Sequence, residues 1–191
     1  MWVRNDVRMP TPWTTKTSRY LLRRWWMNLR EDHVVLPDGR EMPEFHVVEY
    51  PDWTCVVCLT SDGRYVMVEQ YRHGIAHVGL EFASGAVDEG EMPLEGAQRE
   101  LLEETGFAAD EWFDLGRCAP EPSKHTNWAH LFVAKGAEPK SLPKLDAGED
   151  IRVCLLEPAE LVAATRNGRL VHGIHVAALW RAREAGLLTG F

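Results

Sequence analysis

Three glutamates, Glu100, Glu103 and Glu104, are the side chains of this 191-residue sequence whose types and spacing best suit chemistry. On an α-helix, at about 100° per residue, they fall within roughly a 100° arc and share one edge. Carboxylates on one edge repel one another, and a divalent cation removes that repulsion while using them as hard oxygen ligands. The pattern therefore allows a site for a divalent cation, although on the helix alone this is the less favoured interpretation. A solvated acidic helix face is the competing interpretation.

The residues around these glutamates predict the helix that carries them, over residues 92–104 with Gly106 as its C-cap. Leu101 and its apolar neighbours lie on the adjoining arc and can anchor the helix to a sheet. Arg99 precedes Glu103 by one helical turn, which is the i, i+4 spacing of an ion pair. Arg99 is therefore a candidate to hold the Glu103 carboxylate in position for catalysis.

The complete pattern over residues 85–107 resembles the Nudix box at every fixed position. It runs Gly85, five residues, Glu91, seven residues, and then Arg-Glu-apolar-x-Glu-Glu-x-Gly-apolar from Arg99 to Phe107. The resemblance implies an α/β/α sandwich in which the box forms a loop, a helix and a loop that hold one to three Mg²⁺ ions, with Mn²⁺ as the alternative. The implied reaction is the attack of water on a diphosphate linked to a nucleoside.

The same resemblance implies a set of metal ligands. Glu100 and Glu104 would be the principal ligands, and Glu103 would bind the ion directly or through water. The carbonyl of Ser84, just before the box glycine, would be a further ligand. A metal ion held there can polarise phosphoryl oxygens and make water a better nucleophile.

Features outside the box resemble the ADP-ribose pyrophosphatase branch of that family, over roughly residues 20–185. They are Gln-Tyr-Arg at residues 70–72, Glu-Phe-Ala-Ser-Gly at residues 81–85, and Pro122, sixteen residues after Gly106. Residues 148–153, Gly-Glu-Asp-Ile-Arg-Val, resemble the loop whose glutamate positions or deprotonates the attacking water. The resemblance carries that catalytic role to Glu149, with Asp150 as the reserve.

Two departures from the branch affect the expected substrate. Ala83-Ser84 stands where Pro-Ala is usual before the box glycine, and residues 122–127 read Pro-Ser-Lys-His-Thr-Asn where Pro-Gly and a later acid are usual. The second loop contacts the terminal sugar half of the substrate in that branch. The branch implies hydrolysis of ADP-ribose to AMP and ribose 5-phosphate, and the altered loop keeps a nucleoside diphosphate sugar such as GDP-mannose as the alternative.

Several side chains are candidates for contact with the substrate. Trp26 and Phe45 stand where related enzymes place rings that sandwich the adenine, with Trp25 and Trp53 as rivals and core or interface packing as the competing interpretation. Lys124 and His125 lie in the altered loop. Arg72 and Glu81 are further candidates, and each has two interpretations.

Arg72 suits a bidentate contact with a phosphate, and a surface salt bridge is an equally good interpretation. Glu81 faces either the metal site or a hydrogen-bonding neighbour, and the metal site is preferred. His172 and His175 are three residues apart, but no carboxylate partner accompanies them in sequence, so metal binding by this pair is disfavoured.

The elements expected around these residues give an α+β fold, a Nudix sandwich with a mixed sheet plus a small N-terminal antiparallel β meander. The first twenty residues are expected to form a loose arm, and residues 20–50 the meander, with residues 25–30 in a strand. The further strands are expected at residues 53–60, 64–71, 78–82, 112–118, 128–134 and 151–156, a polar loop at 135–149, and helices at 158–166 and 171–184. We expect two parts, residues 1–50 for dimerisation and base binding and residues 51–191 as the hydrolase domain.

Composition limits the class of protein. The net charge of −8 argues against binding a long nucleic acid, because such a partner needs a basic surface. No stretch approaches the roughly 20 apolar residues that cross a bilayer, and residues 1–12 lack the apolar core of a secretory signal. A cytoplasmic enzyme with a small nucleotide substrate and no membrane partner is expected.

The four cysteines do not suggest a metal site. Cys55 and Cys58 lie in a predicted strand, where the two-residue period points them to opposite faces, and no second pair stands at zinc spacing. Buried reduced thiols are expected.

Other functions were weighed against hydrolysis. A non-catalytic nucleotide sensor is disfavoured because the box is intact and no basic recognition helix is present. An mRNA-decapping role is disfavoured by the acidic charge. The branch resemblance and the apolar meander, which needs a cover, together predict a homodimer.

Overall fold

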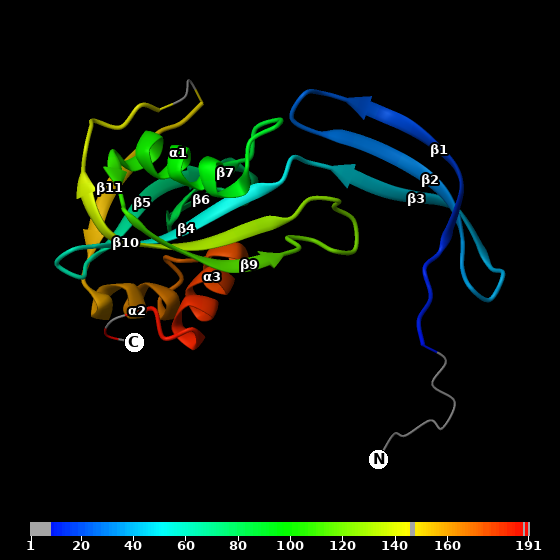
Figure 1. Cartoon of the computed structure of the whole chain (residues 1–191). Coiled ribbons are helices and arrows are strands. Elements are labelled where there is room, and N and C mark those ends of the chain that lie inside the picture. Colours follow the sequence, from blue (N-terminus) through cyan, green and yellow to red (C-terminus); the bar gives the residue numbers. More distant parts are fainter. Residues whose placement is uncertain (1–8, 146–147, 189, 191) are drawn as a thin grey trace, which may run out of the picture. The chain divides into compact units, whose positions relative to one another are not determined.

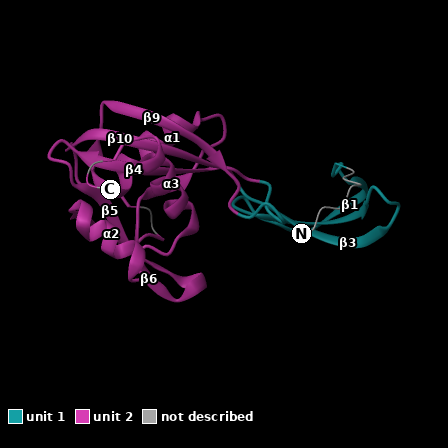
Figure 2. Cartoon of the chain, turned by 90° about the horizontal axis from the view of Figure 1, so that it is seen from below, with its two compact units in different colours: residues 1–50, 121–126 teal, residues 51–120, 127–191 magenta. Residues whose placement is uncertain are grey.

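The computed structural model describes residues 9–145, 148–188 and 190. The chain divides into two compact units, coloured separately in Figure 2. Unit 1 comprises Met1–Tyr50 and Glu121–Thr126, and unit 2 comprises Pro51–Pro120 and Asn127–Phe191. Residues 1–8 of the expected arm and residues 146–147 of the expected polar loop lie outside the described residues.

Unit 1 is built on a three-stranded antiparallel sheet in the order β1-β2-β3, as expected for a meander. The strands are β1 (Thr14–Arg23), β2 (Asn28–Val35) and β3 (Glu41–Glu49). The predicted turn joins β2 to β3: the Gly39 N–H donates to the Leu36 carbonyl at 2.9 Å, and Gly39 has a φ of 86°. Only glycine adopts that φ without strain, so this residue fixes the hairpin.

Two expectations for unit 1 were wrong. Residues 14–20 were expected in a loose arm but form part of β1, where they pair with residues 30–35 of β2 and so obtain partners for their backbone groups. Trp25 and Trp26 were expected in a strand but lie in the turn between β1 and β2, which the Arg24 N–H closes onto the Met27 carbonyl at 3.0 Å.

The sheet of unit 1 has almost no core of its own. Among the described residues of this unit, Val34 and Asp32 alone are buried, and nearly all of β1 is exposed. Asp32 is held by the Arg30 guanidinium at 2.9 Å. Burial this small contributes little hydrophobic stabilisation.

Unit 2 contains a mixed sheet of eight strands. Its main path is β11-β5-β4-β10-β8, while β6 pairs with β5, β7 with β4, and β9 with β10. The β4–β10 pair is parallel, and the other pairs are antiparallel. The strands are β4 (Trp53–Thr60), β5 (Tyr65–Arg72), β6 (His77–Glu81), β7 (Ala83–Ala86), β8 (Phe107–Ala108), β9 (Glu111–Cys118), β10 (Ala129–Pro139) and β11 (Ile151–Leu156).

Helices cover both faces of this sheet (Figure 1), which confirms the expected α+β sandwich. Helix α1 (Pro93–Thr105) packs on one face, and α2 (Pro158–Arg166) and α3 (Gly173–Glu184) pack on the other. The side chains of β4 alternate between two cores: Cys55 packs with the residues of α2 and α3, and Cys58 packs with those of α1. The two thiols are therefore free, buried and on opposite faces, as expected.

Several boundaries in unit 2 differ from expectation, and β7 and β8 were not expected as strands. Residues 135–139 were expected in a polar loop but continue β10, because Ala137 pairs with Thr60 and Glu138 with Ala108. Helix α3 begins at Gly173 rather than at residue 171, since His172 serves as its N-cap. Among the described residues, no helix is long and apolar enough to cross a membrane.

Candidate active site

Helix α1 is fixed at both ends and along one side, which places its glutamates accurately. Pro93 occupies the first turn, and Gly106 ends the helix in the left-handed conformation with a φ of 76°. Ala97 and Leu101 are fully buried against the sheet. A Cβ on Gly106 would overlap the Ser141 carbonyl oxygen, so this position requires glycine for space as well as for φ.

The carboxylate of Glu100 lies directly over Gly85 at the start of the box. A Cβ on Gly85 would overlap the Glu100 carboxylate, and the Glu100 side chain is only 12% exposed. The missing Cβ therefore creates the space that this carboxylate occupies. Burial raises the pKa of Glu100, the ion pair with Arg99 opposes that rise, and the charges of Glu103 and Glu149 add to it.

Glu104 is the most deeply buried of the three glutamates and is tied to the strand before the box. Its Oε2 accepts a hydrogen bond from the Ser84 N–H at 2.9 Å, and the residue is 3% exposed. The pKa of Glu104 is raised to about 8, and burial is the largest cause. The charges of Glu100 and Glu149 also raise it, while the Ser84 hydrogen bond lowers it. The Ser84 hydroxyl is buried and has no hydrogen-bond partner among the described residues.

Arg99 contacts three box glutamates, whereas its spacing predicted a pair with Glu103 alone. Its Nη1 contacts Glu103 at 3.2 Å, which is the expected i, i+4 pair, and Glu100 at 2.7 Å. Its Nε and Nη2 bind the two oxygens of Glu91, each at 3.0 Å. Sequence reasoning missed the Glu91 pair, although Glu91 is itself a fixed position of the box. The Arg99 guanidinium thus links the loop to the helix.

Arg72 and Glu81 form a bidentate ion pair, with distances of 2.8 and 2.6 Å. Glu81 is 2% exposed and is held by Arg72, so the structure gives it a hydrogen-bonding neighbour, which was the less favoured of its two interpretations. The Glu81 hydrogen bond raises the pKa of Arg72, burial opposes it, and the charges of Glu104 and Glu149 raise it further. Arg72 is thus within electrostatic reach of the box carboxylates as well as paired.

Glu149 belongs to the same electrostatic neighbourhood. Its negative charge contributes to the raised pKa values of Glu100 and Glu104 and to the raised pKa of Arg72. The loop before β11 therefore brings a fourth carboxylate to the box. Sequence reasoning selected this residue through the branch resemblance alone.

A cavity of about 330 Å³ adjoins Arg72. It is lined by Trp53, Arg72, His73, Gly74, Ile75 and His172. Trp53, a rival candidate for base binding, packs against the His172 ring at 5.2 Å between centroids. An arginine beside an aromatic wall suits a ligand with both a phosphate and a ring.

The remaining substrate candidates belong to unit 1. Trp26 is 48% exposed and packs edge-on against Trp25, while Phe45 packs edge-on against Trp13 at 5.8 Å. Trp13 was not anticipated as the partner of Phe45, because it lay in the expected arm.

Lys124 and His125 also lie in unit 1 and are held against the end of β3. The Val48 N–H donates to the Lys124 carbonyl at 2.8 Å, and the His125 ring packs against Tyr50 at 5.1 Å. Backbone pairing with β3 thus orders the altered loop.

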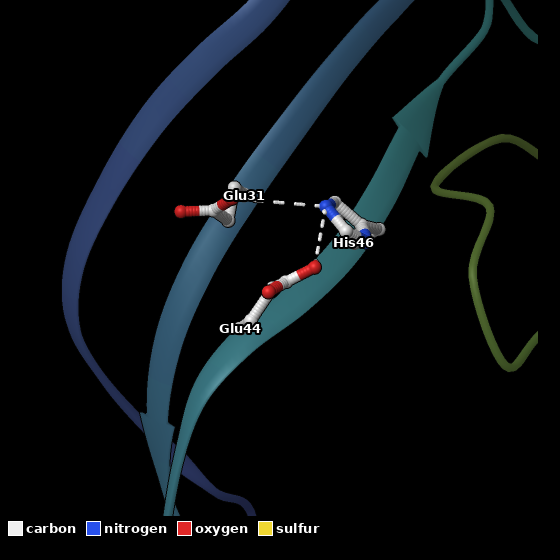
Figure 3. A group of neighbouring side chains, drawn as sticks. All are labelled: Glu31, Glu44 and His46. Atoms are coloured by element: carbon white, nitrogen blue, oxygen red, sulfur yellow. Dashed lines mark ion pairs between the residues drawn. The ribbon is translucent and has the colours of Figure 1, made fainter.

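A second group of ligand-type side chains lies on the sheet of unit 1 (Figure 3). His46 Nε2 is 3.7 Å from Glu31 and 3.5 Å from Glu44. Glu31 is already engaged by the Arg19 guanidinium at 2.7 Å, and Glu44 is largely exposed. We regard this group as a surface ion-pair cluster, which needs no metal to account for its charges.

The donor set at the box fits a hard divalent cation. The charge of Glu100 adds to the cost of ionising Glu104, and the space that Gly85 leaves open is filled by the Glu100 carboxylate. In the described structure the Arg99 guanidinium holds Glu100, and the Ser84 N–H holds Glu104. Oxygen ligands of this kind suit Mg²⁺ and Mn²⁺.

Comparison with known proteins agrees with this geometry. Residues 50–174 match the model of the NUDIX domain, and residues 13–48 match the model of the nucleoside diphosphate sugar hydrolase N-terminal domain. The chain belongs to the Nudix family, and the expected enzyme class, a Nudix pyrophosphohydrolase, is confirmed with it.

Curated relatives and a solved structure add detail. The chain is 28% identical over 165 residues to an ADP-ribose pyrophosphatase of Bacillus subtilis, covering 83% of this chain and 89% of that protein. It is 35% identical over 114 residues to a methanol dehydrogenase activator of Bacillus methanolicus, covering 60% of this chain and 61% of the activator. A crystal structure of an ADP compounds hydrolase shares the fold, with a TM-score of 0.82 at 22% identity over 94% of this chain and 96% of that chain.

Proposed function

We propose that the protein hydrolyses ADP-ribose to AMP and ribose 5-phosphate with Mg²⁺ as its cofactor and Mn²⁺ as a substitute. The observation that carries the proposal is the pairing of buried Glu104 with the Ser84 amide beside Glu100, at the start of an intact Nudix box. The similarity to ADP-ribose pyrophosphatases of Bacillus subtilis and Mycobacterium tuberculosis supports this substrate.

In this proposal the box residues hold the ion against the diphosphate. Glu100 and Glu104 are the principal ligands, with Glu103 and the Ser84 carbonyl completing the set. When bound, the ion polarises phosphoryl oxygens and favours deprotonation of the attacking water. Arg99 keeps Glu100 and Glu103 in position, since its guanidinium contacts both carboxylates.

The proton and the phosphate charge are assigned to residues beside the box. Glu149 positions the attacking water and accepts its proton, with Asp150 as the reserve. Arg72 contacts a phosphate oxygen, and Glu81 holds the Arg72 guanidinium in the orientation that this contact requires. The 330 Å³ cavity beside Arg72 leaves room for the group attached to that phosphate.

The substrate's base and its distal sugar are assigned to unit 1. Trp26 and Phe45 sandwich the adenine, and Lys124 and His125 contact the sugar half. A homodimer is part of the proposal, because the sheet of unit 1 leaves large apolar side chains such as Tyr20, Leu21 and Trp25 exposed. A cytoplasmic location is also proposed and is supported by the four free cysteines.

A nucleoside diphosphate sugar such as GDP-mannose is the second candidate substrate. The match of residues 13–48 to the nucleoside diphosphate sugar hydrolase N-terminal domain favours it, as does the altered loop at residues 122–127. Both substrates present a diphosphate to the same carboxylates. They differ in the base and in the distal sugar.

Hydrolysis of ADP-ribose and GDP-mannose in ¹⁸O-labelled water, with identification of the products, tests the function. We expect Mg²⁺-dependent release of AMP and ribose 5-phosphate, with the label on one of the two products. Retention of full activity after thorough chelation would overturn the metal-dependent mechanism. Turnover of GDP-mannose with none of ADP-ribose would replace the first substrate by the second.

A further inference from the structure

Two histidines that the proposed reaction does not use lie at the start of α3, on the opposite face of the sheet from α1. His175 is fully buried, and its Nδ1 accepts a hydrogen bond from the Phe82 N–H at 3.1 Å. The His172 ring stacks on the His175 ring with 4.3 Å between centroids and 21° between planes. His172 Nδ1 in turn accepts from the Ile174 N–H at 3.3 Å, which caps the helix.

Phe82 occupies a break in the sheet. Strand β6 ends at Glu81 and β7 begins at Ala83, so the Phe82 amide lies between two strands and donates to a side chain of α3 instead. Two residues later, the Ser84 amide donates to Glu104 of α1. Backbone amides therefore tie residues 81–84 to the helices on both faces of the sheet: the Phe82 amide to α3 and the Ser84 amide to α1.

The residues at either end of this segment both serve the candidate active site. Glu81 binds Arg72, and the Ser84 amide binds Glu104; the proposed function also assigns the Ser84 carbonyl to the ion. A shift of the Phe82 backbone would also move Glu81 and Ser84, because the peptide units that join them are rigid. The His175–Phe82 hydrogen bond thus affects the positions of Glu81 and Ser84 as well as the packing of α3.

The chemistry of the imidazole makes the hydrogen bond selective for one form of His175. An Nδ1 that accepts from an amide carries no proton, so the neutral ring bears its hydrogen on Nε2. Burial lowers the pKa of His175 well below its usual range, and the nearby His172 and Arg72 lower it further. The aromatic rings of Phe82 and Trp53 lie beside the His175 imidazole. These apolar neighbours favour the neutral ring, in which Nδ1 accepts the hydrogen bond.

We propose that His175 is a positioning residue for hydrolysis: by accepting the Phe82 amide, it sets the path of residues 81–84 and so aligns the Ser84 carbonyl and the Glu81–Arg72 pair with the box. His172 supports it by stacking on the ring. The inference rests on the proposed function for the roles of Ser84 and Arg72. The hydrogen bond itself can be tested without substrate.

Three substitutions separate positioning from packing. In His175→Asn the side-chain oxygen occupies the place of Nδ1 and still accepts from Phe82, whereas His175→Leu fills the space without an acceptor. His175→Gln reaches toward the place of Nε2 and also fails to accept. Leu179→Ala, a buried position on the same helix, is the control for loss of packing alone.

We expect His175→Leu and His175→Gln to raise the Mg²⁺ concentration for half-maximal rate and to lower kcat, each by about tenfold, as for the loss of other supports of metal ligands. His175→Asn should restore both values to within about threefold of the unsubstituted protein. Leu179→Ala should lower Tm and leave the Mg²⁺ requirement unchanged. Equal losses in the Asn and Leu variants, or a normal Mg²⁺ requirement in the Leu variant, would overturn the proposal.

A readout independent of turnover distinguishes this inference from the proposed function. Amide exchange at Phe82 and the ¹⁵N shifts of the His175 ring, measured by NMR without metal or substrate, should show a protected amide and an unprotonated Nδ1. Protection should be lost in His175→Leu and retained in His175→Asn. If the protein failed to hydrolyse ADP-ribose while these signals and calorimetric Mg²⁺ binding followed the predicted order, the function would fail and the positioning role would stand.

Discussion

The Glu100 carboxylate occupies the space that a side chain on Gly85 would fill. The overlap involves the end of a flexible side chain, and Gly85 does not have a positive φ, so the backbone can accept alanine. We therefore expect Gly85→Ala to change the free energy of unfolding by less than about 1 kcal/mol while displacing Glu100. The Mg²⁺ concentration for half-maximal rate should rise about tenfold or more, measured by titrating the metal at saturating ADP-ribose.

Gly173→Ala is the matched control for that substitution. Nothing lies within 4 Å of a Cβ at Gly173, and the residue also lacks a positive φ. Its Mg²⁺ requirement should be normal. A normal requirement in Gly85→Ala as well would remove Glu100 from the proposed ligand set.

Glu104→Gln should abolish turnover and preserve the fold. The amide oxygen can still accept from the Ser84 N–H, but it lacks the charge that a cation needs. We expect kcat to fall by about 100-fold or more with a circular dichroism spectrum like that of the unsubstituted protein. Glu111→Gln, an exposed position on β9, should keep full activity. A near-normal rate in Glu104→Gln would show that this carboxylate does not bind the ion.

The stability of the metal-free protein should fall as the pH rises. Glu104 has a pKa of about 8 in the fold against an ordinary value of 4.5, because burial disfavours its charge. A raised carboxyl pKa contributes stability that is complete below pH 4.5 and is lost as the pH rises through about 8. Thermal unfolding in a chelator at pH 5 to 9 measures this contribution, and Mg²⁺ should raise Tm more at pH 8.5 than at pH 6.

Glu104→Gln again supplies the comparison, since it cannot titrate. Its Tm in chelator should depend less on pH than that of the unsubstituted protein. Identical pH profiles for the two proteins would contradict the assignment of the raised pKa to Glu104.

Arg99→Lys should weaken catalysis although it keeps the positive charge. The guanidinium binds Glu91 through two nitrogens and reaches Glu100 and Glu103 with a third, and an ammonium group cannot make that set of contacts. We expect kcat/KM for ADP-ribose to fall about tenfold, with a raised Mg²⁺ requirement. Arg166→Lys, an exposed position at the end of α2, should be neutral.

The protein should behave as a dimer of 21.7 kDa chains in size-exclusion chromatography with light scattering. The reason is the uncovered sheet of unit 1, where almost no side chain is buried. Replacing both Tyr20 and Leu21 of β1 by serine should weaken association and leave the mixed sheet folded. A monomer at every concentration tested would defeat this part of the proposal.

Sequence alone located the box helix and most strands because their signals are local. The spacing of Glu100, Glu103 and Glu104, the proline at the helix start and the glycine at its end all lie within one segment. The Nudix resemblance then supplied Ser84 and Glu149, whose relation to the helix no local pattern contains. The mixed sheet and the N-terminal meander were likewise predicted from local sequence patterns and from the Nudix resemblance.

The remaining features depend on partners that are distant in sequence. His175 and Phe82 are 93 residues apart, and no period or motif relates them. A salt bridge was one interpretation of Arg72 and a hydrogen-bonding neighbour one of Glu81, but that the two residues pair with each other required the register of β5 against β6. Residues 14–20 were expected to be a loose arm because they are threonines and other polar residues with no apolar face to bury. They form a strand through backbone pairing with β2, which side-chain pattern does not reveal.

The thin sheet of unit 1 has a consequence for how the enzyme is studied. Two buried side chains contribute little toward the entropy lost in ordering three strands. The order of such a sheet responds by mass action to whatever binds its surfaces. If a second copy is that ligand, as proposed, dilution in an assay should lower the fraction of chains whose proposed base-binding residues are ordered, and specific activity should then depend on enzyme concentration.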